Sequence, residues 1–228
     1  MKITWLSQAG LLFDNGVGTL LVDPYFSDSV ERIEPENKRR IPVPAWAFSL
    51  SPDIMLFTHD HLDHYDPETA SHFLRKAEKA LTVLSPTSVY KRVRALGGGH
   101  NCVELSPGVE WTEKGFRVTA VRAAHSDPYA IGVIITDLSD GKNYYVTGDT
   151  LYQSEIFPSL PDAVYAVFLP INGRGNNMNK IDAVRFAEAT GARYIVPIHF
   201  GLFDSLDPYI EGKENAVYPT PFEIIRFH

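Results

Sequence analysis

Thr58-His59-Asp60-His61-Leu62-Asp63-His64 is the most informative stretch of this sequence, and it follows the apolar run 54–57 directly. A strand that ends there leaves the backbone free to coil, so several side chains can turn toward one centre. Neutral imidazole and carboxylate are ligands that Zn²⁺, Mn²⁺ and Fe²⁺ accept without any cysteine. The stretch therefore predicts a metal site with four ligands, namely His59, His61, Asp63 and His64.

The same arrangement, an apolar run closed by a ligand-type residue, recurs three times further along the chain. The runs 116–124, 144–148 and 194–198 end at His125, Asp149 and His199. Taken singly, a histidine is more often a surface or hydrogen-bonded residue, and we give no role to His72, His100 and His228. Ligands at one end of several strands would meet at one edge of the sheets. The repeated arrangement therefore predicts a dinuclear metal site.

Short apolar runs separated by glycine, proline and aspartate predict strands in both halves of the chain. These strands are Lys2–Leu6, Leu11–Phe13, Thr19–Val22, Ile54–Phe57, Phe116–Val121, Ile131–Thr136, Tyr144–Val146, Val164–Leu169 and Tyr194–Ile198. Helix signals lie between them, and no linker or change of composition divides the chain. We therefore expect one α/β domain over residues 1–228, built from layered sheets and helices.

Three segments carry helix signals. Asp66 can cap a helix with Pro67 at its first position, and the apolar spacing continues to Leu81. A second helix is expected from Ser85-Pro86 to Leu96, and a third over 180–190 with Asn179 as its cap and Gly191 after its end. The Pro-rich segment 34–52 and the Asn-rich segment 172–179 are expected to be irregular, as binding loops often are.

Composition narrows the classes of protein that this chain can represent. The 228 residues are 44% hydrophobic and carry a net charge of −7, which fits a folded globular protein and argues against a nucleic-acid-binding domain. Cys102 is the only cysteine, so no internal disulfide can form, and a reducing cytoplasm is expected. We expect no signal peptide and no membrane span, because the longest apolar run covers only residues 163–169.

The pattern of ligands resembles the metallo-β-lactamase superfamily. That resemblance implies a four-layer αββα sandwich with two metal ions at the edge of its sheets. It also implies that His59, His61 and His125 hold the first ion, that Asp63, His64 and His199 hold the second, and that Asp149 bridges the two. The ligands suit Zn²⁺ or Mn²⁺.

Further stretches resemble the L-ascorbate-6-phosphate lactonase (UlaG-like) group of that superfamily. The resemblance runs from the first residues to about Asp207, and it implies hydrolysis of a lactone or ester, with a phosphorylated sugar lactone as one candidate. The stretches that carry it are Ile3-Thr4-Trp5-Leu6-Ser7-Gln8-Ala9-Gly10, Leu21-Val22-Asp23-Pro24-Tyr25-Phe26-Ser27-Asp28, Arg40-Ile41-Pro42, Pro170-Ile171-Asn172-Gly173, Asn177-Met178-Asn179 and Ile198-His199-Phe200.

The expected chemistry assigns roles to residues around the metals. Two divalent cations that share a water yield hydroxide at neutral pH, which would attack the carbonyl carbon. Asp63 is the candidate to accept the proton and pass it to the leaving oxygen, or else it is only a ligand. Substrate-binding candidates are Arg174 and Arg40 for a phosphate and Asn177 for hydroxyl groups. Asp23 and Asp60 are candidates to hold ligand imidazoles.

Other functions remain open at this point. Two metals also suit a phosphodiesterase. The resemblance implies two further candidates, a phospholipase D-type enzyme and, with a single iron, a dioxygenase. A metal-binding module without catalysis would predict eroded ligands, whereas all seven are present. The expected partner is a small-molecule substrate, without nucleic acid or membrane insertion, and the sequence does not indicate an oligomeric state.

Overall fold

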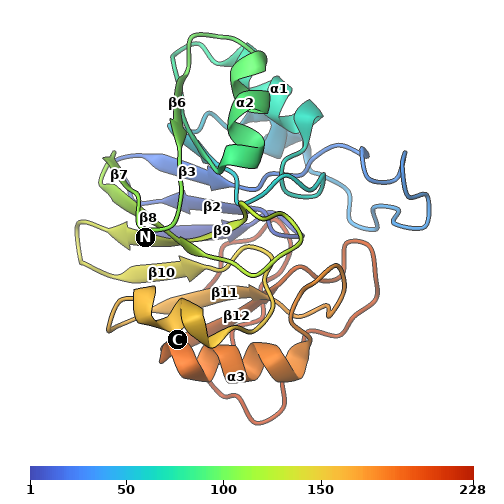
Figure 1. Cartoon of the computed structure of the whole chain (residues 1–228). Coiled ribbons are helices and arrows are strands. Elements are labelled where there is room, and N and C mark those ends of the chain that lie inside the picture. The colour runs from blue at the N-terminus through green and yellow to red at the C-terminus, as the bar shows by residue number, and fades with distance from the viewer.

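A computed structural model describes residues 1–228 and shows two six-stranded sheets with helices on their outer faces (Figure 1). The strands are β1 (Lys2–Trp5), β2 (Leu11–Asp14), β3 (Thr19–Val22), β4 (Ile54–Leu56), β5 (Thr82–Ser85), β6 (Asn101–Glu104), β7 (Glu110–Glu113), β8 (Phe116–Arg122), β9 (Ile131–Asp137), β10 (Asn143–Val146), β11 (Ala166–Pro170) and β12 (Tyr194–Ile198). The helices are α1 (Pro67–Lys76), α2 (Thr87–Ala95) and α3 (Lys180–Thr190), with short 3₁₀ turns η1 (Ala45–Ser49) and η2 (Ser154–Ser159).

Each sheet mixes parallel and antiparallel pairs. The first sheet has the order β1-β2-β3-β4-β5-β6, and the second has the order β12-β11-β10-β9-β8-β7. Helices α1 and α2 cover the first sheet, and α3 covers the second, so the layers follow the expected αββα order (Figure 1). None of the helices combines the length and apolar character that crossing a bilayer would require.

The core lies between the two sheets. The ring of Phe13 on β2 meets the ring of Phe168 on β11 edge to face, with centroids 5.8 Å apart, and both side chains are fully buried. A smaller apolar cluster fills the space under α1 and α2, where Phe73 and Val89 pack with Met55 and Val83 of the sheet. Burial of such large side chains is the main source of the fold's stability.

The helix caps at Asp66 and Asn179 are confirmed. Asp66 accepts hydrogen bonds from the backbone N–H groups of Glu68 and Thr69, and Asn179 does the same for Ile181 and Asp182. The expected end of α1 at Leu81 is wrong, because the helix ends at Lys76. The expected start of the second helix at Ser85-Pro86 is also wrong, because Ser85 is the last residue of β5 and α2 begins at Thr87, after Pro86.

Three strands, β5, β6 and β7, are absent from the sequence expectation. The four-residue β5 is buried throughout, so its short apolar run looks like the continuation of α1. The strands β6 and β7 are edge strands that are half exposed and rich in glutamate. Without a buried face, their residues lack the alternating pattern that identifies a strand.

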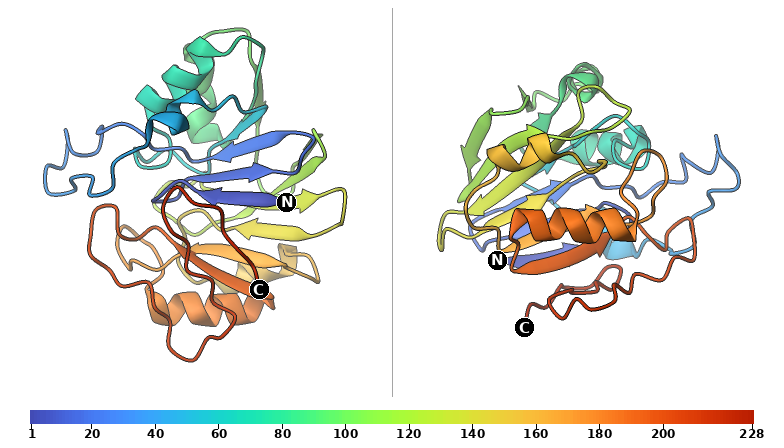
Figure 2. Two further views of the ribbon diagram at one scale, coloured as in Figure 1. Left: turned by 180° about the vertical axis from the view of Figure 1, so that it is seen from behind. Right: turned by 60° about the horizontal axis from the view of Figure 1, so that its bottom comes forward.

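The irregular segment after residue 200 runs along β1, an edge strand of the first sheet, and along β12, an edge strand of the second (Figure 2). Backbone N–H groups of Phe222 and Ile225 donate to β1, and Ile195 of β12 exchanges backbone hydrogen bonds with Asn215 and Val217. We refer to residues 213–225 as the C-terminal strip. It pairs backbone groups that an open edge would otherwise leave free.

Candidate metal centre

Seven side chains converge at one edge of the two sheets, where β4, β8, β10 and β12 end. Their candidate ligand atoms form three groups, and within each group these atoms lie within 4.8 Å of one another. We refer to His59, His61 and His125 as the histidine triad, and to Asp63, His64 and His199 as the mixed triad. The third group contains His59, His64 and Asp149, so Asp149 lies where the two triads meet.

The histidine triad presents imidazole lone pairs to a common point. The hydroxyl of Thr58 donates to Asp23, so it can only accept from Nδ1–H of His59, 3.0 Å away. Nδ1–H of His125 donates to the carbonyl oxygen of Asn176 at 3.3 Å. In both residues Nε2 is then the nitrogen without a proton, which is the tautomer that a metal requires. Nδ1 of the third member, His61, lies 3.1 Å from Nε2 of His125.

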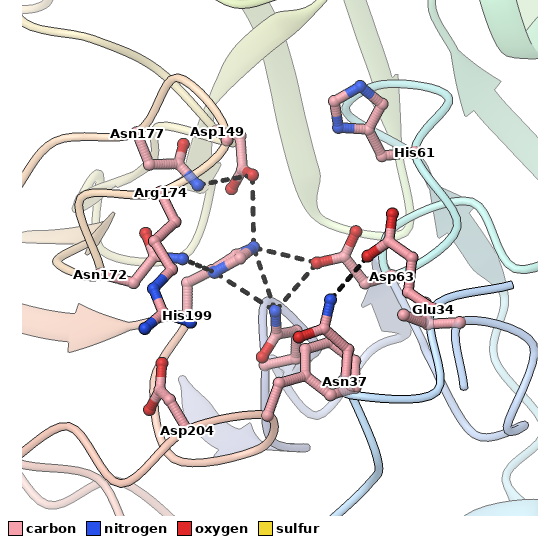
Figure 3. Close-up of a pocket in the computed structure, with 14 residues that line it drawn as sticks. Glu34, Asn37, His61, Asp63, Asp149, Asn172, Arg174, Asn177, His199 and Asp204 are labelled. Carbon is pink, nitrogen blue, oxygen red and sulfur yellow. Dashed lines mark hydrogen bonds and ion pairs between the residues drawn. The ribbon is translucent and has the colours of Figure 1, made fainter.

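The mixed triad interleaves histidines with carboxylates, and Figure 3 shows one of these histidines, His199, between Asp63 and Asp149. Nε2 of His199 lies 3.1 Å from Oδ2 of Asp63 and 3.2 Å from Oδ2 of Asp149. Nε2 of His64 lies 3.2 Å from Oδ1 of Asp149, although the geometry there is not that of a hydrogen bond. The other nitrogen of His64 donates to Asp23 at 2.8 Å, as the sequence predicts for Asp23.

The electrostatics of the two triads differ. Burial lowers the pKa of His59 and His125, and the neighbouring histidines lower it further for both. Burial opposes charge on His64 and His199 too, but Asp149 and Asp63 overcome this, so the pKa of His64 lies well above its ordinary value and that of His199 rises to about 10. Without a cation, protons on these two imidazoles balance the carboxylates.

The same contacts lower the pKa of both carboxyl groups despite their burial. His64 and His199 hold the pKa of Asp63 well below its usual range, and they do the same for Asp149. Both side chains are therefore carboxylates at neutral pH, with oxygen atoms available to a cation.

The residues fit a bound divalent cation. The Nε2 atoms of His59 and His64 are buried and have no hydrogen-bond partner, which is costly unless another group satisfies them. Five imidazoles and two carboxylates form an all-nitrogen and oxygen donor set. Such a set suits Zn²⁺ or Mn²⁺, and Asp149 reaches ligands of both triads.

Unusual backbone conformations bring the ligand loops together. Gly148, before Asp149, has φ of 60°, and a Cβ there would lie 2.8 Å from the carbonyl oxygen of Ile131. His199 also has φ of 60°, and its backbone N–H donates to the carbonyl oxygen of Gln8 at 2.9 Å. A left-handed histidine is strained, and such strain concentrates at functional sites.

Two carboxamides that the sequence expectation did not assign contact the mixed triad. Nε2 of Gln8 donates to Oδ2 of Asp63 at 2.9 Å and lies within 3.2 Å of both ring nitrogens of His199. Nδ2 of Asn172 lies 3.0 Å from Nδ1 of His199. Asn172 follows the end of β11 closely, so the rule that located the other ligands could have found it. In the sequence, Gln8 is only a polar residue that follows the apolar run of β1, so no pattern marks it as part of the site.

A cavity of about 230 Å³ opens beside Asp63, Asp149 and His199, and we refer to it as the main cavity (Figure 3). Asn177 lines it, but its amide donates to Oδ2 of Asp149 at 2.7 Å and thus holds a candidate ligand. Arg174 lines it as an exposed residue with no acidic partner within 4.0 Å. The remaining lining residues are Gln8, Val30, Glu34, Asn37, His61, Asn172, Gly175, Phe203 and Asp204.

Two expected positions lie elsewhere. Arg40 does not line the main cavity: its side chain is exposed, and its backbone N–H donates to Leu202. The neighbouring Arg39 points inward, where it donates to the carbonyl oxygens of Tyr25 and Ser27, and this fixes the direction of the segment. Asp60 contacts no ligand imidazole: its carboxylate lies 3.8 Å from Arg92.

Two facing mixed sheets with metal-binding side chains at one edge define a protein of the metallo-β-lactamase fold. The chain belongs to the beta-lactamase superfamily, because the model of the beta-lactamase superfamily domain matches residues 19–200. Relatives of similar length include a UPF0173 protein of Pyrococcus furiosus, 29% identical over 216 residues, which cover 94% of this chain and 90% of the relative.

Other relatives are named for their chemistry. A UPF0173 metal-dependent hydrolase of Thermoplasma volcanium is 27% identical over 214 residues, which cover 90% of this chain and 85% of the relative. A solved metallo hydrolase from Ignicoccus hospitalis has the same fold, with a TM-score of 0.75 at 19% identity over 100% of this chain and 98% of that one. The chain is a metal-dependent hydrolase of this superfamily.

Proposed function

We propose that this hydrolase uses two divalent cations, Zn²⁺ or Mn²⁺, to open a lactone or cleave an ester. The observation that carries the proposal is the position of Asp149, whose carboxylate lies with His59 of one triad and His64 of the other. One carboxylate that reaches both triads suits two ions that share a water molecule. When bound, such ions lower the pKa of that water and polarise a substrate carbonyl.

Asp63 is the residue best placed to move the proton. Asp63 and Asp149 both line the main cavity, but the side chain of Asp63 is 18% exposed and that of Asp149 only 6%. Gln8 donates to Oδ2 of Asp63, which fixes the orientation of the carboxylate. Asp63 can then accept the proton from the attacking water and pass it to the leaving oxygen.

Arg174 is the candidate for an anionic group of the substrate. No acidic side chain lies within salt-bridge distance of it, so its guanidinium can form two hydrogen bonds with a phosphate. A phosphorylated sugar lactone fits this arrangement. Asn177 lines the cavity, and although its Nδ2 holds Asp149, its Oδ1 has no hydrogen-bond partner, so it stays a candidate for a substrate hydroxyl group. Arg40 lies outside the cavity.

One purified sample, loaded with Zn²⁺ or Mn²⁺ and analysed for metal content, tests the reaction class. We expect turnover of simple and phosphorylated lactones, and little turnover of bis(p-nitrophenyl) phosphate. Hydrolysis of the phosphodiester alone would reject the lactonase proposal in favour of a phosphodiesterase. Oxygen consumption by an iron-loaded sample would instead favour a dioxygenase.

Arg174→Gln tests recognition of the phosphate. We expect KM for a phosphorylated lactone to rise about tenfold or more, because the variant loses a charge-assisted pair of hydrogen bonds. KM for the same lactone without phosphate serves as the internal reference. Arg193→Gln, a matched change that lies away from the cavity, should leave both values unchanged.

We also propose that the protein works in the cytoplasm on a small-molecule substrate as one domain over residues 1–228. Its one thiol, Cys102, is unpaired, which suits a reducing compartment.

A further inference from the structure

A second cavity, of about 620 Å³, adjoins the main cavity at the metal centre. The two share Val30, Glu34, His61, Asp63 and Gly175, and the second extends past Ile33 and Leu62 to Arg92 of α2. We refer to this second cavity as the side arm. Because His61 and Asp63 line both spaces, a molecule that reacts at the metal centre can extend into either one.

The side arm has an apolar wall that a small core supports. Val30 is 8% exposed and packs with Tyr25 and Leu202, and Leu62 packs against this cluster. Ile33 lines the same space with 69% of its surface exposed. An isolated exposed isoleucine is ordinary, but three apolar side chains here line one space that opens onto candidate ligands.

The charges of the side arm do not favour an anion. Arg92 lies 3.8 Å from the carboxylate of Asp60, donates to the Asp60 carbonyl oxygen at 3.3 Å, and stacks over the ring of Tyr65 with 4.6 Å to its centroid. Its charge is therefore matched locally. Glu34 adds a carboxylate where the two spaces meet, which disfavours a second anionic group.

We infer that the side arm binds an uncharged alkyl or aryl substituent of the substrate, while the polar or anionic part faces Arg174. This inference rests on the proposed lactone or ester hydrolysis and adds the class of substrate: an amphiphilic lactone or ester rather than a compact, wholly polar one. Ile33 and Leu62 contact the apolar substituent and set the preference for it.

The experiment compares two lactones that have the same ring, γ-butyrolactone and γ-nonalactone, and differ by a pentyl substituent. The metal-loaded wild-type enzyme should show kcat/KM at least about tenfold higher for γ-nonalactone, because each buried methylene contributes roughly a factor of four. Ile33→Ser should lower the ratio of the two kcat/KM values about fourfold, and Ile33→Leu should restore it. Ile181→Ser is the matched control, because Ile181 is 73% exposed on α3 and lines neither cavity.

Each outcome decides the inference. Equal kcat/KM values for the two lactones, or an unchanged ratio in Ile33→Ser, would overturn it while leaving lactone hydrolysis intact. If neither lactone is hydrolysed, the proposed hydrolysis of simple lactones fails, and calorimetric titration with the two hydroxy acids, 4-hydroxybutanoate and 4-hydroxynonanoate, still tests the side arm. Tighter binding of 4-hydroxynonanoate, weakened in Ile33→Ser, would support the side arm, and equal binding would reject it.

Discussion

The histidine triad and the mixed triad lie side by side, but the protonation of their histidines differs. Hydroxyl and carbonyl oxygens fix the tautomers of His59 and His125 as neutral imidazoles with lowered pKa values. His64 and His199 lie among carboxylates that raise their pKa values. The histidine triad is therefore ready for an ion, whereas the mixed triad must first lose protons, so we expect the two ions to bind unequally.

Asp149→Ala should have the largest effect on metal binding and activity, because Asp149 lies beside ligands of both the histidine triad and the mixed triad. We expect loss of both ions' tight binding and a fall in kcat/KM of more than about 100-fold, beyond the range seen when residues behind a ligand are changed. Metal analysis after dialysis and a lactone assay measure the two effects. Asp162→Ala, an exposed acidic residue, is the control. Full metal content in Asp149→Ala would remove Asp149 from the site.

Asp63→Asn separates binding from proton transfer within the mixed triad. If Asp63 moves the proton, kcat should fall by about 100-fold or more while most of the metal is retained, because an amide can still offer an oxygen ligand but cannot accept a proton. The histidine triad contains no carboxylate that could do the same. Parallel loss of metal and rate would show that Asp63 is a ligand only.

The pH dependence of metal binding sharpens the comparison further. His199, with a pKa of about 10 instead of 6.5, stays protonated at neutral pH, so a cation competes with that proton. Affinity at the mixed triad should therefore rise with pH toward 10, by up to about tenfold per pH unit for each proton displaced. The histidine triad should show a flat dependence above pH 7.

The variant His125→Ala leaves the mixed triad intact, and His199→Ala leaves the histidine triad intact. Titrations of both variants with Zn²⁺ at pH 6.5, 7.5 and 8.5 therefore measure how the metal affinity of each triad depends on pH. We expect the steeper slope for His125→Ala. Equal slopes in the two variants would contradict the assigned difference in protonation.

The sequence predicts that these seven side chains converge, because their positions follow one simple rule. Each lies where an apolar run ends, and strands of a sandwich end at a common edge, so His125, Asp149 and His199 meet the 59–64 stretch without knowledge of the loops between. The family resemblance and the layer order are confirmed at the level of the superfamily.

What the sequence could not supply depends on side-chain direction. Arg39 and Arg40 are adjacent, and the contacts of Arg39 with the ring of Tyr25, 4.6 Å away, and with the carbonyl oxygens of Tyr25 and Ser27 decide which one turns inward. Asn177 sits in the expected loop but donates to Asp149, because the tight turn after Gly175 directs its amide inward. Short edge strands such as β7 carry no buried face that a pattern could reveal.

The C-terminal strip bears on how copies of this protein meet one another. Since it pairs with β1 and β12, the strand edges that remain open are those of β6 and β7, each four residues long. Those two strands carry Glu104, Glu110 and Glu113, and like charges oppose pairing of one such edge with another. The arrangement protects a protein with two open sheets from edge-to-edge aggregation at high concentration.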